Sequence, residues 1–436
     1  MLIQLQDQLN SKLSFLKSSK LLIAISGGLD SVVLTHLCCK LGLNVALAHC
    51  NFNLRGKESD ADEDFVLQLA EDLDLEVFIE SFETKLFAED EKISIQMAAR
   101  VLRYQWFAEL TEQLHFEYIL TAHHADDNLE TFLINLTRGT GLDGLLGIPA
   151  VNNNVVRPLL SFTREDIETY ARAHKLEWRE DSSNISTKYL RNKLRHDVIP
   201  ILKEINPQLL QNFAKTQLFL NRTKCIVDDK IAEVIPKVIK PIDDYTFSLN
   251  ISEIKNLGHP KAYLYELLKD FGFTEWQDVF ALLDAQSGKY VQSHSHRLIK
   301  DRTCLLLSEI QNNKSHIITI LESDKVVNTP FGALLINDVD AITETDKSVI
   351  YIDKDRVKFP LTIRKWEKGD VFYPLGMTGK KKLSKYFKDE KYSLLDKENA
   401  WLLCSEDNIV WVIGKRADNR FKVTENTKQI LKVELK

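Results

Sequence analysis

The feature that most constrains this chain is the segment 21–34, LLIAISGGLDSVVL, in which a short apolar run meets two adjacent glycines and then a helical pattern. Residues 21–25 predict a buried strand, and residues 31–42 predict a helix. Glycine has no Cβ, so the two glycines allow a tight turn with positive φ and leave room for a ligand. The amides of such a turn and the positive end of the helix point at one spot. The segment therefore predicts a pyrophosphate-binding turn.

The predicted cradle consists of six consecutive residues: Ser26, Gly27, Gly28, Leu29, Asp30 and Ser31. The two serine hydroxyls add hydrogen-bond donors. Asp30 would repel a phosphate unless it held Mg²⁺ against it, so we expect Asp30 to be a metal ligand. The alternative is a plain Gly-Gly turn with a Ser/Asp helix cap. Six residues in a strand–turn–helix context favour phosphate binding, and the Walker A pattern GxxxxGK[ST] is absent.

Short apolar runs alternate with helical patterns over the first 160 residues. The expected strands are 21–25, 44–50, 76–81, 118–122 and 155–160, and the expected helices are 31–42, 59–74, 95–114, 126–138 and 163–174. Strands that alternate with helices of this length indicate βαβ units and a parallel sheet covered on both faces. The fold class is therefore predicted to be α/β, with an N-terminal doubly wound parallel sheet.

The remaining chain changes character twice. Residues 190–235 look helical, 240–310 mix helices with strands, and the sequence beyond about 315 is rich in strands. We therefore expect a catalytic domain at 1–205, a helical and mixed middle domain at 206–345, and a small α+β domain at 346–436.

A second candidate site lies where the strand 118–122 ends and the next helix begins. Helical spacing would place His123, Asp127 and Glu130 on one face. Two carboxylates there could bind Mg²⁺ or hold an ammonium group. A zinc or iron site that includes His124, and a solvated helix start, are the alternatives.

Basic residues form two further groups. Arg191 and Arg195 share a predicted helical face and suit phosphate binding, although surface arginines are a plain alternative.

From Leu361 onward the sequence has 17 Lys and Arg and 11 Asp and Glu, a net charge of +6, which leaves −12 for the rest of the chain. Such asymmetry indicates a polyanionic partner, and a solvated lysine-rich surface is the alternative. A cluster with interleaved aromatic residues fits RNA docking: Lys380, Lys381, Lys382 and Lys385, among Trp366, Phe372, Tyr373, Tyr386 and Phe387. We expect Phe387 and Trp411 to be core.

The six cysteines form no CxxC pair and no metal-ligand spacing, which is typical of reduced thiols in a cytoplasmic protein. No apolar run reaches the roughly 18 residues that span a bilayer, so no membrane partner is expected.

SGGLDS after a strand resembles the PP-loop of ATP pyrophosphatases, which fold like adenine nucleotide alpha hydrolases. Further motifs resemble the tRNA(Ile)-lysidine synthetase family: HCNFNLRG (49–56), AARVLRY (98–104), AHHADDNLET (122–131), RGTGLDGL (138–145), VVRPLL (155–160), DSSNISTKYLRNKLRHDVIPIL (181–202), KGDVFYPLGM (368–377), KKLSKYFKDEK (381–391) and VIGKRADNRFKVTENTK (412–428). Two positions depart from the family pattern, since Phe52 stands where a histidine is frequent and Val371 where an arginine is frequent.

The resemblance implies a ligase that uses ATP and Mg²⁺ on the isoleucine tRNA with a CAU anticodon. Its wobble cytidine would be adenylated, and the ε-amine of free L-lysine would then displace AMP to give lysidine. By the same resemblance Asp30 and Asp127 would hold Mg²⁺, Asp127 and Glu130 would bind Mg²⁺ or lysine, and Arg191 and Arg195 would stabilise phosphate charge. A PP-loop tRNA thiolase and a non-catalytic tRNA-binding protein are the rivals, and a homodimer stays open.

Overall fold

The computed structural model describes all residues except 181–189, 311–316, 344–345 and 378. The chain divides into two compact units, Met1–Asp228 and Asp229–Lys436, which are described separately. Residues 181–189 of the motif 181–202 lie outside the described residues, and so does the start of the strand-rich region expected beyond about 315.

The first unit is built on a six-stranded sheet with the order β3-β2-β1-β4-β6-β5. Its strands are β1 (Leu21–Ala24), β2 (Val45–Asn51), β3 (Val77–Ser81), β4 (Tyr118–Leu120), β5 (Val151–Asn152) and β6 (Val155–Val156). All neighbouring strands run parallel except β5, which pairs antiparallel with β6. The predicted α/β class with a parallel sheet is confirmed. The last strand is shorter than expected because Pro158 has no N–H to continue a ladder.

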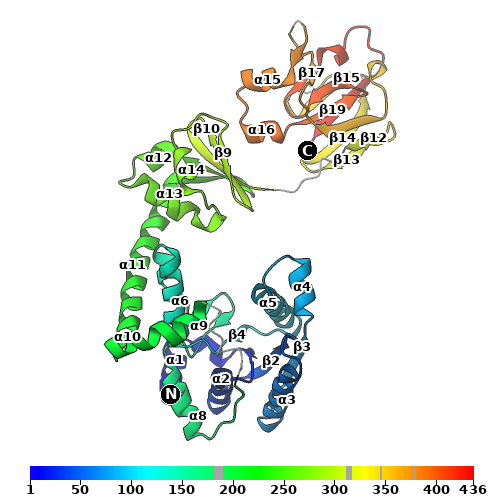
Figure 1. Cartoon of the computed structure of the whole chain (residues 1–436). Coiled ribbons are helices and arrows are strands. Elements are labelled where there is room, and N and C mark those ends of the chain that lie inside the picture. The colour runs from blue at the N-terminus through cyan, green and yellow to red at the C-terminus, as the bar shows by residue number, and fades with distance from the viewer. Residues whose placement is uncertain (181–189, 311–316, 344–345, 378) are drawn as a thin grey trace. The chain divides into compact units, whose positions relative to one another are not determined.

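Side chains that alternate along β1 supply cores on both faces of the sheet. Leu21 and Ile23 pack with α1 (Leu2–Ser11), α2 (Leu29–Lys40), α3 (Lys57–Asp72) and α8 (Arg164–Ala173). Leu22 points to the other face and packs with α5 (Ile95–Leu114). Helix α4 (Thr84–Asp90) lies next to α5 in Figure 1. Period-two alternation in a strand buried on both sides produces this double core.

The strand order places a topological switch point between β1 and β4. Strands β2 and β3 extend the sheet on one side of β1, whereas β4 and β6 extend it on the other. In open parallel sheets, ligands bind at the carboxyl ends of the strands where the order reverses. The loop after β1 holds the SGGLDS motif and the loop after β4 leads into α6 (Ala125–Arg138). The two motifs of highest chemical interest therefore meet at this edge.

Helices follow the sheet: α7 (Leu142–Leu145), α9 (Leu190–Lys193), η3 (Leu194–Val198), α10 (Ile199–Ile205) and α11 (Leu209–Val238). Segment η3 is a π-helical turn between α9 and α10. Such turns are rare and frequently occur at functional sites. This turn carries Arg195.

The second unit begins with an antiparallel sheet in the order β7-β8-β11-β10-β9. Its strands are β7 (Ile239–Asp243), β8 (Thr246–Asn250), β9 (Tyr290–Gln292), β10 (His296–Asp301) and β11 (Cys304–Glu309), and its helices are α12 (Ile251–Lys255), α13 (Pro260–Leu268) and α14 (Trp276–Ala281). One hydrophobic cluster joins these helices to the sheet.

Two further antiparallel sheets share a hydrophobic core. One has the order β12-β16-β19-β20-β21, with β12 (Ile318–Ile320), β16 (Leu361–Lys365), β19 (Trp401–Ser405), β20 (Asn408–Val412) and β21 (Arg416–Ala417). The other has the order β13-β14-β22-β15, with β13 (Val326–Thr329), β14 (Gly332–Val339), β15 (Val349–Asp353) and β22 (Ile430–Leu435). Strands β12 and β14, which precede position 346, therefore pair with β16 and β22, which follow it.

The lysine-rich tail folds around its own small core. A hairpin of β17 (Val371–Phe372) and β18 (Lys381–Lys382) precedes α15 (Leu383–Asp389) and α16 (Leu394–Glu398). Phe387 and Trp411 are both fully buried, as expected. Phe372 and Tyr386 are buried as well. Phe372 and Tyr386 thus join Phe387 in the core of this part of the chain, and they do not lie exposed beside the lysines.

Candidate active site

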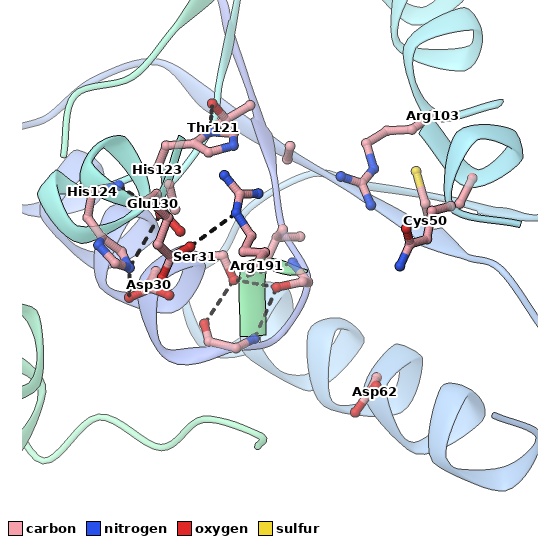
Figure 2. Close-up of a pocket in the computed structure, with 18 of the residues that line it drawn as sticks. Asp30, Ser31, Cys50, Asp62, Arg103, Thr121, His123, His124, Glu130 and Arg191 are labelled. Atoms are coloured by element: carbon pink, nitrogen blue, oxygen red, sulfur yellow. Dashed lines mark hydrogen bonds and ion pairs between the residues drawn. The ribbon is translucent and has the colours of Figure 1, made fainter. Parts of the chain in front are cut away.

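A cavity of about 1210 Å³ opens at the switch point of the sheet in the first unit. It is lined by the loop after β1, the ends of β2 and β4, and parts of α5, α6, α8 and α9–α10. The predicted residues Ser26, Gly28, Asp30 and Ser31 line it, and so do Asp127, Glu130, Arg191 and Arg195 from three later segments. The fold thus gathers groups that are far apart in sequence into one site (Figure 2).

The phosphate loop has the conformation that its glycines predict. Gly27 has a φ of +81°, and a Cβ built there would lie 3.2 Å from the ring of Phe65. The hydroxyl of Ser31 donates to the carbonyl of Gly28 at 2.9 Å, and the amide of Ser26 faces that hydroxyl at 3.3 Å. A residue with a side chain at Gly27 would meet both backbone strain and crowding. The turn is therefore braced from within and leaves its outer side to the cavity.

Asp30 lies in the first turn of α2 and faces the start of α6. Nε2 of His124 is 3.8 Å from Oδ1 of Asp30 and 3.4 Å from Oδ2 of Asp127 (Figure 2). His124 is the N-cap of α6 and is buried, with 4% of its surface exposed. Asp30 also forms an ion pair with Arg164, the first residue of α8. Two carboxylates from separate loops are thus brought next to one histidine.

Glu130 is held by two arginines. Nε of Arg195 lies 2.6 Å from Oε1 of Glu130, and Nε of Arg191 lies 3.1 Å from Oε2. Arg195 also reaches Asp127 at 3.3 Å, and Figure 2 shows Arg191 directed toward Glu130. Burial raises the pKa of Glu130, although the hydrogen bond and charge of Arg195 act against this. The predicted pairs therefore come together, but the arginines contact the carboxylates instead of an open phosphate site.

Asp126 connects three helices at the wall of the cavity. Nζ of Lys203 contacts Oδ1 of Asp126 at 2.7 Å, and the backbone N–H of Arg164 donates to Oδ2 at 2.9 Å. Burial would raise the pKa of Asp126, but these two contacts lower it overall. The carboxylate therefore links the starts of α6 and α8 to α10.

His123 does not share the face predicted for it. Helix α6 begins at Ala125, so His123 precedes the helix and its spacing to Asp127 is not helical. Its Nδ1 lies 3.0 Å from the hydroxyl of Thr121. Burial lowers the pKa of His123 to about 4, with Asp127 opposing the shift. The neighbouring His124 takes the place between the carboxylates, because it is the N-cap and α6 begins only at Ala125.

The two carboxylates suit Mg²⁺ only together with a nucleotide. Within the described residues, no group of three or more His, Cys, Asp or Glu side chains is arranged to hold a metal ion. Mg²⁺ in nucleotide sites commonly uses one or two carboxylates, water and substrate phosphates. Asp30 and Asp127, both next to His124 and both lining the cavity, supply such a pair.

Sequence reasoning did not single out His124 as the central residue of the site, and it did not name Arg164, Lys203 or Asp62. Asp62 of α3 accepts from Nη2 of Arg55 at 2.7 Å and pairs with Arg179. The amide of Arg179 donates to the carbonyl of Gly27 at 3.0 Å. Arg164, Lys203 and Asp62 all lie in predicted helices, and nothing in the sequence pattern indicated their partners.

Among the described cysteines, only Cys50 lines the cavity. Burial raises the pKa of the Cys50 thiol to about 12, although nearby Arg103 lowers it in part. Cys38 is buried inside α2, where burial raises its pKa strongly, and packs in the hydrophobic core. Neither thiol is activated as a nucleophile.

The predicted tRNA-binding lysines lie in the second unit. Lys380, Lys382 and Lys385 are exposed. Lys381 is half-buried, contacts Asp389 at 2.8 Å and lies over the ring of Tyr386. Three of the four lysines thus present their charge to solvent.

Three family models match the chain. A PP-loop domain matches residues 1–202, a TilS substrate binding domain matches 242–310, and a TilS substrate C-terminal domain matches 361–435. These matches cover both units.

Curated relatives match over nearly the whole length. A tRNA(Ile)-lysidine synthase from Parabacteroides distasonis is 42% identical over 417 residues, which are 94% of each chain. The tRNA(Ile)-lysidine synthase from Bacteroides thetaiotaomicron is 40% identical and covers 96% of this chain and 95% of its own. Among solved structures, a tRNA thiolase from Methanococcus maripaludis is 18% identical, covers 50% of this chain and 78% of its own, and has a TM-score of 0.43.

Proposed function

The chain belongs to the tRNA(Ile)-lysidine synthase family, and from that premise we propose that it joins lysine to C2 of the wobble cytidine in the isoleucine tRNA with a CAU anticodon. The product, lysidine, changes the codon that this tRNA reads from AUG to AUA. The observation that carries the proposal is the 42% identity over 94% of both chains, together with a complete PP-loop in a large cavity.

The first half of the reaction activates the base. The triphosphate of ATP lies on the loop from Ser26 to Ser31, whose backbone and hydroxyl donors face the cavity. The 2-carbonyl oxygen of the cytidine attacks the α-phosphate and pyrophosphate leaves. Mg²⁺, when bound, neutralises phosphate charge, and Asp30 and Asp127 are the residues that would hold it.

The second half couples the amine. The ε-amine of lysine attacks C2 of the adenylated cytidine and AMP leaves, which completes the carbon–nitrogen bond. The geometry favours Asp127 over Glu130 as a direct ligand of lysine or Mg²⁺, because Glu130 is 1% exposed and engaged by two guanidinium groups. In this proposal Glu130 positions Arg191 and Arg195, which stabilise phosphate charge.

RNA binding is assigned to the second unit. The lysines at 380, 381, 382 and 385 supply charge for phosphate contacts, which position RNA without reading its sequence.

Within the described residues no helix is long and apolar enough to cross a membrane. We propose a cytoplasmic enzyme, and a homodimer stays an open expectation.

The rival thiolase activity is disfavoured by the thiols. Such chemistry usually needs cysteines near the nucleotide, frequently in pairs. Cys50 is the single described cysteine in the cavity, and its raised pKa keeps it protonated at neutral pH. Cys38 lies in the hydrophobic core of the first unit.

The direct test uses the intact protein with ATP, labelled lysine and the isoleucine tRNA. We expect label in the RNA, lysidine after nuclease digestion, and one AMP and one pyrophosphate for each lysine joined. The methionine tRNA serves as the control. Release of AMP without label in the RNA, or label in both RNAs alike, would contradict the assignment.

A further inference from the structure

The guanidinium of Arg164 lies on the phosphate loop. It forms an ion pair with both carboxylate oxygens of Asp30, the acidic residue of that loop. The Arg164 side chain is 45% exposed and lines the cavity beside Gly28 and Ser31. An arginine that is half open to a phosphate site, and whose side chain pairs with the carboxylate of that site, is well placed for a second partner.

The backbone of Arg164 is fixed although its side chain is exposed. Its N–H donates to Asp126 at 2.9 Å, and the preceding Thr163 caps α8 by accepting from the amide of Asp166 at 3.1 Å. The amide of Ala125, at the start of α6, donates to the carbonyl of Phe162 at 2.8 Å. These bonds hold the Cα of Arg164 at the rim, so that only its flexible side chain needs to move.

Most of the cations that line the cavity are already paired with carboxylates. Among the described residues, the lining has six cations and seven carboxylates, namely Arg55, Arg103, Arg164, Arg191, Arg195 and Lys203, with Asp30, Asp62, Asp126, Asp127, Glu130, Glu165 and Glu168. Five of the six cations are engaged by lining carboxylates. A triphosphate adds several negative charges, and a paired arginine at the rim can contact them by exchanging its carboxylate for a phosphate.

We propose that Arg164 is a phosphate-binding residue for ATP, which pairs with Asp30 in the free protein and moves to the triphosphate when nucleotide binds. The inference rests on the proposed use of ATP. Arg164 is favoured because Asp30 is the carboxylate that belongs to the phosphate loop, whereas Arg191 and Arg195 hold a buried glutamate. A guanidinium also suits the exchange because its planar fork binds carboxylate and phosphate in the same bidentate way.

The experiment measures binding of a non-hydrolysable ATP analogue by calorimetry, separately from catalysis. R164A should weaken the affinity roughly 10- to 100-fold, because hydrogen bonds to charged groups are worth about 1.5–3 kcal/mol. R164K keeps the charge without the fork and should lie between R164A and wild type. R172A removes an exposed arginine from the same helix α8 and should bind like wild type.

Adenosine separates phosphate binding from a general loss of structure. Without phosphates to contact, adenosine should bind R164A and wild type with equal affinity. Free guanidinium at millimolar concentration should restore part of the ATP affinity of R164A and change that of R172A little. If R164A does not fold, as judged from its melting temperature, R164K carries the same comparison.

Two results would overturn the inference: unchanged ATP affinity in both Arg164 variants, or an equal loss for ATP and adenosine. A wild-type protein that binds ATP and makes no lysidine would instead contradict the proposed function and leave this inference standing.

Discussion

Arg195 contacts both carboxylate oxygens of Glu130, with Nε 2.6 Å from Oε1 and Nη2 3.0 Å from Oε2, although 65 residues separate the two in sequence. The pair joins the π-helical turn after α9 to the middle of α6. A forked guanidinium and a carboxylate form a geometrically specific pair. The contact therefore fixes the position of Arg195 and, through the second oxygen, that of Arg191.

Glu130→Gln should sharply reduce lysidine formation. Removing one member of a desolvated charge pair costs about 2–5 kcal/mol, so we expect kcat/KM for tRNA modification to fall at least about 30-fold. Glu204→Gln on α10 is the matched control, because Glu204 is exposed. Unchanged turnover and lysine dependence in E130Q would rule out a role for this carboxylate.

Asp30→Ala should abolish AMP formation and leave the fold intact. The side chain supports a charge next to the phosphate loop, and it is 27% exposed and outside the hydrophobic core. Thin-layer separation of labelled AMP measures the activity, and circular dichroism on heating checks the fold. Near-normal AMP production by the folded variant would exclude Asp30 from the nucleotide site.

Replacing Lys380, Lys381, Lys382 and Lys385 with alanine should weaken tRNA binding and flatten its dependence on salt. Each lysine that meets a phosphate releases counterions, so its loss reduces the slope of log K against log salt. ATP affinity should stay the same. Binding titrations at several salt concentrations provide the measurement.

Four exposed lysines elsewhere in the second unit, Lys347, Lys358, Lys422 and Lys428, form the control for net charge. If both quadruple variants shift the slope equally, bulk charge explains the effect and the cluster is an ordinary solvated surface. A deletion experiment must begin before β12, because removal from position 350 onward would strip β14 of its partner β22 and β12 of its partner β16.

Acid should destabilise the first unit partly through His123. The folded protein holds its pKa at about 4, whereas the ordinary value is 6.5. Between these values the unfolded chain binds a proton that the folded chain does not, so stability rises with pH from about 4 to 6.5. The shift corresponds to at most about 3 kcal/mol.

His123→Asn should therefore reduce the loss of stability between pH 7 and pH 4.5. Urea denaturation at several pH values measures this loss, and His259→Asn in the second unit is the comparison. Parallel stability curves for wild type and H123N would contradict the assigned pKa.

The regular elements of the first unit were predictable because burial on both faces of a sheet imposes long apolar runs and helices of matching length. The α5 range 95–114 was predicted to the residue. Arg191 and Arg195 were expected to lie close together, and both do contact Glu130, whereas their role in phosphate binding stays a prediction. The contact of these arginines with carboxylates, in place of an open phosphate site, was not predictable. An ion pair depends on the approach of side chains from separate elements. His123 was misplaced for a local reason, since the helix begins two residues later than its spacing required.

Strand β22 has consequences for how the protein is made. It lies between β14 and β15 and pairs with both, yet it comes from positions 430–435. Ribosomes deliver residues in order at about 5–20 each second, so β14 and β15 each keep an unpaired edge until residues 430–435 emerge. A message that stops a few codons before position 430 would yield a protein with its ATP-binding unit complete and two aggregation-prone edges exposed. A truncation just before position 430 should therefore give a protein that aggregates although its nucleotide site is intact.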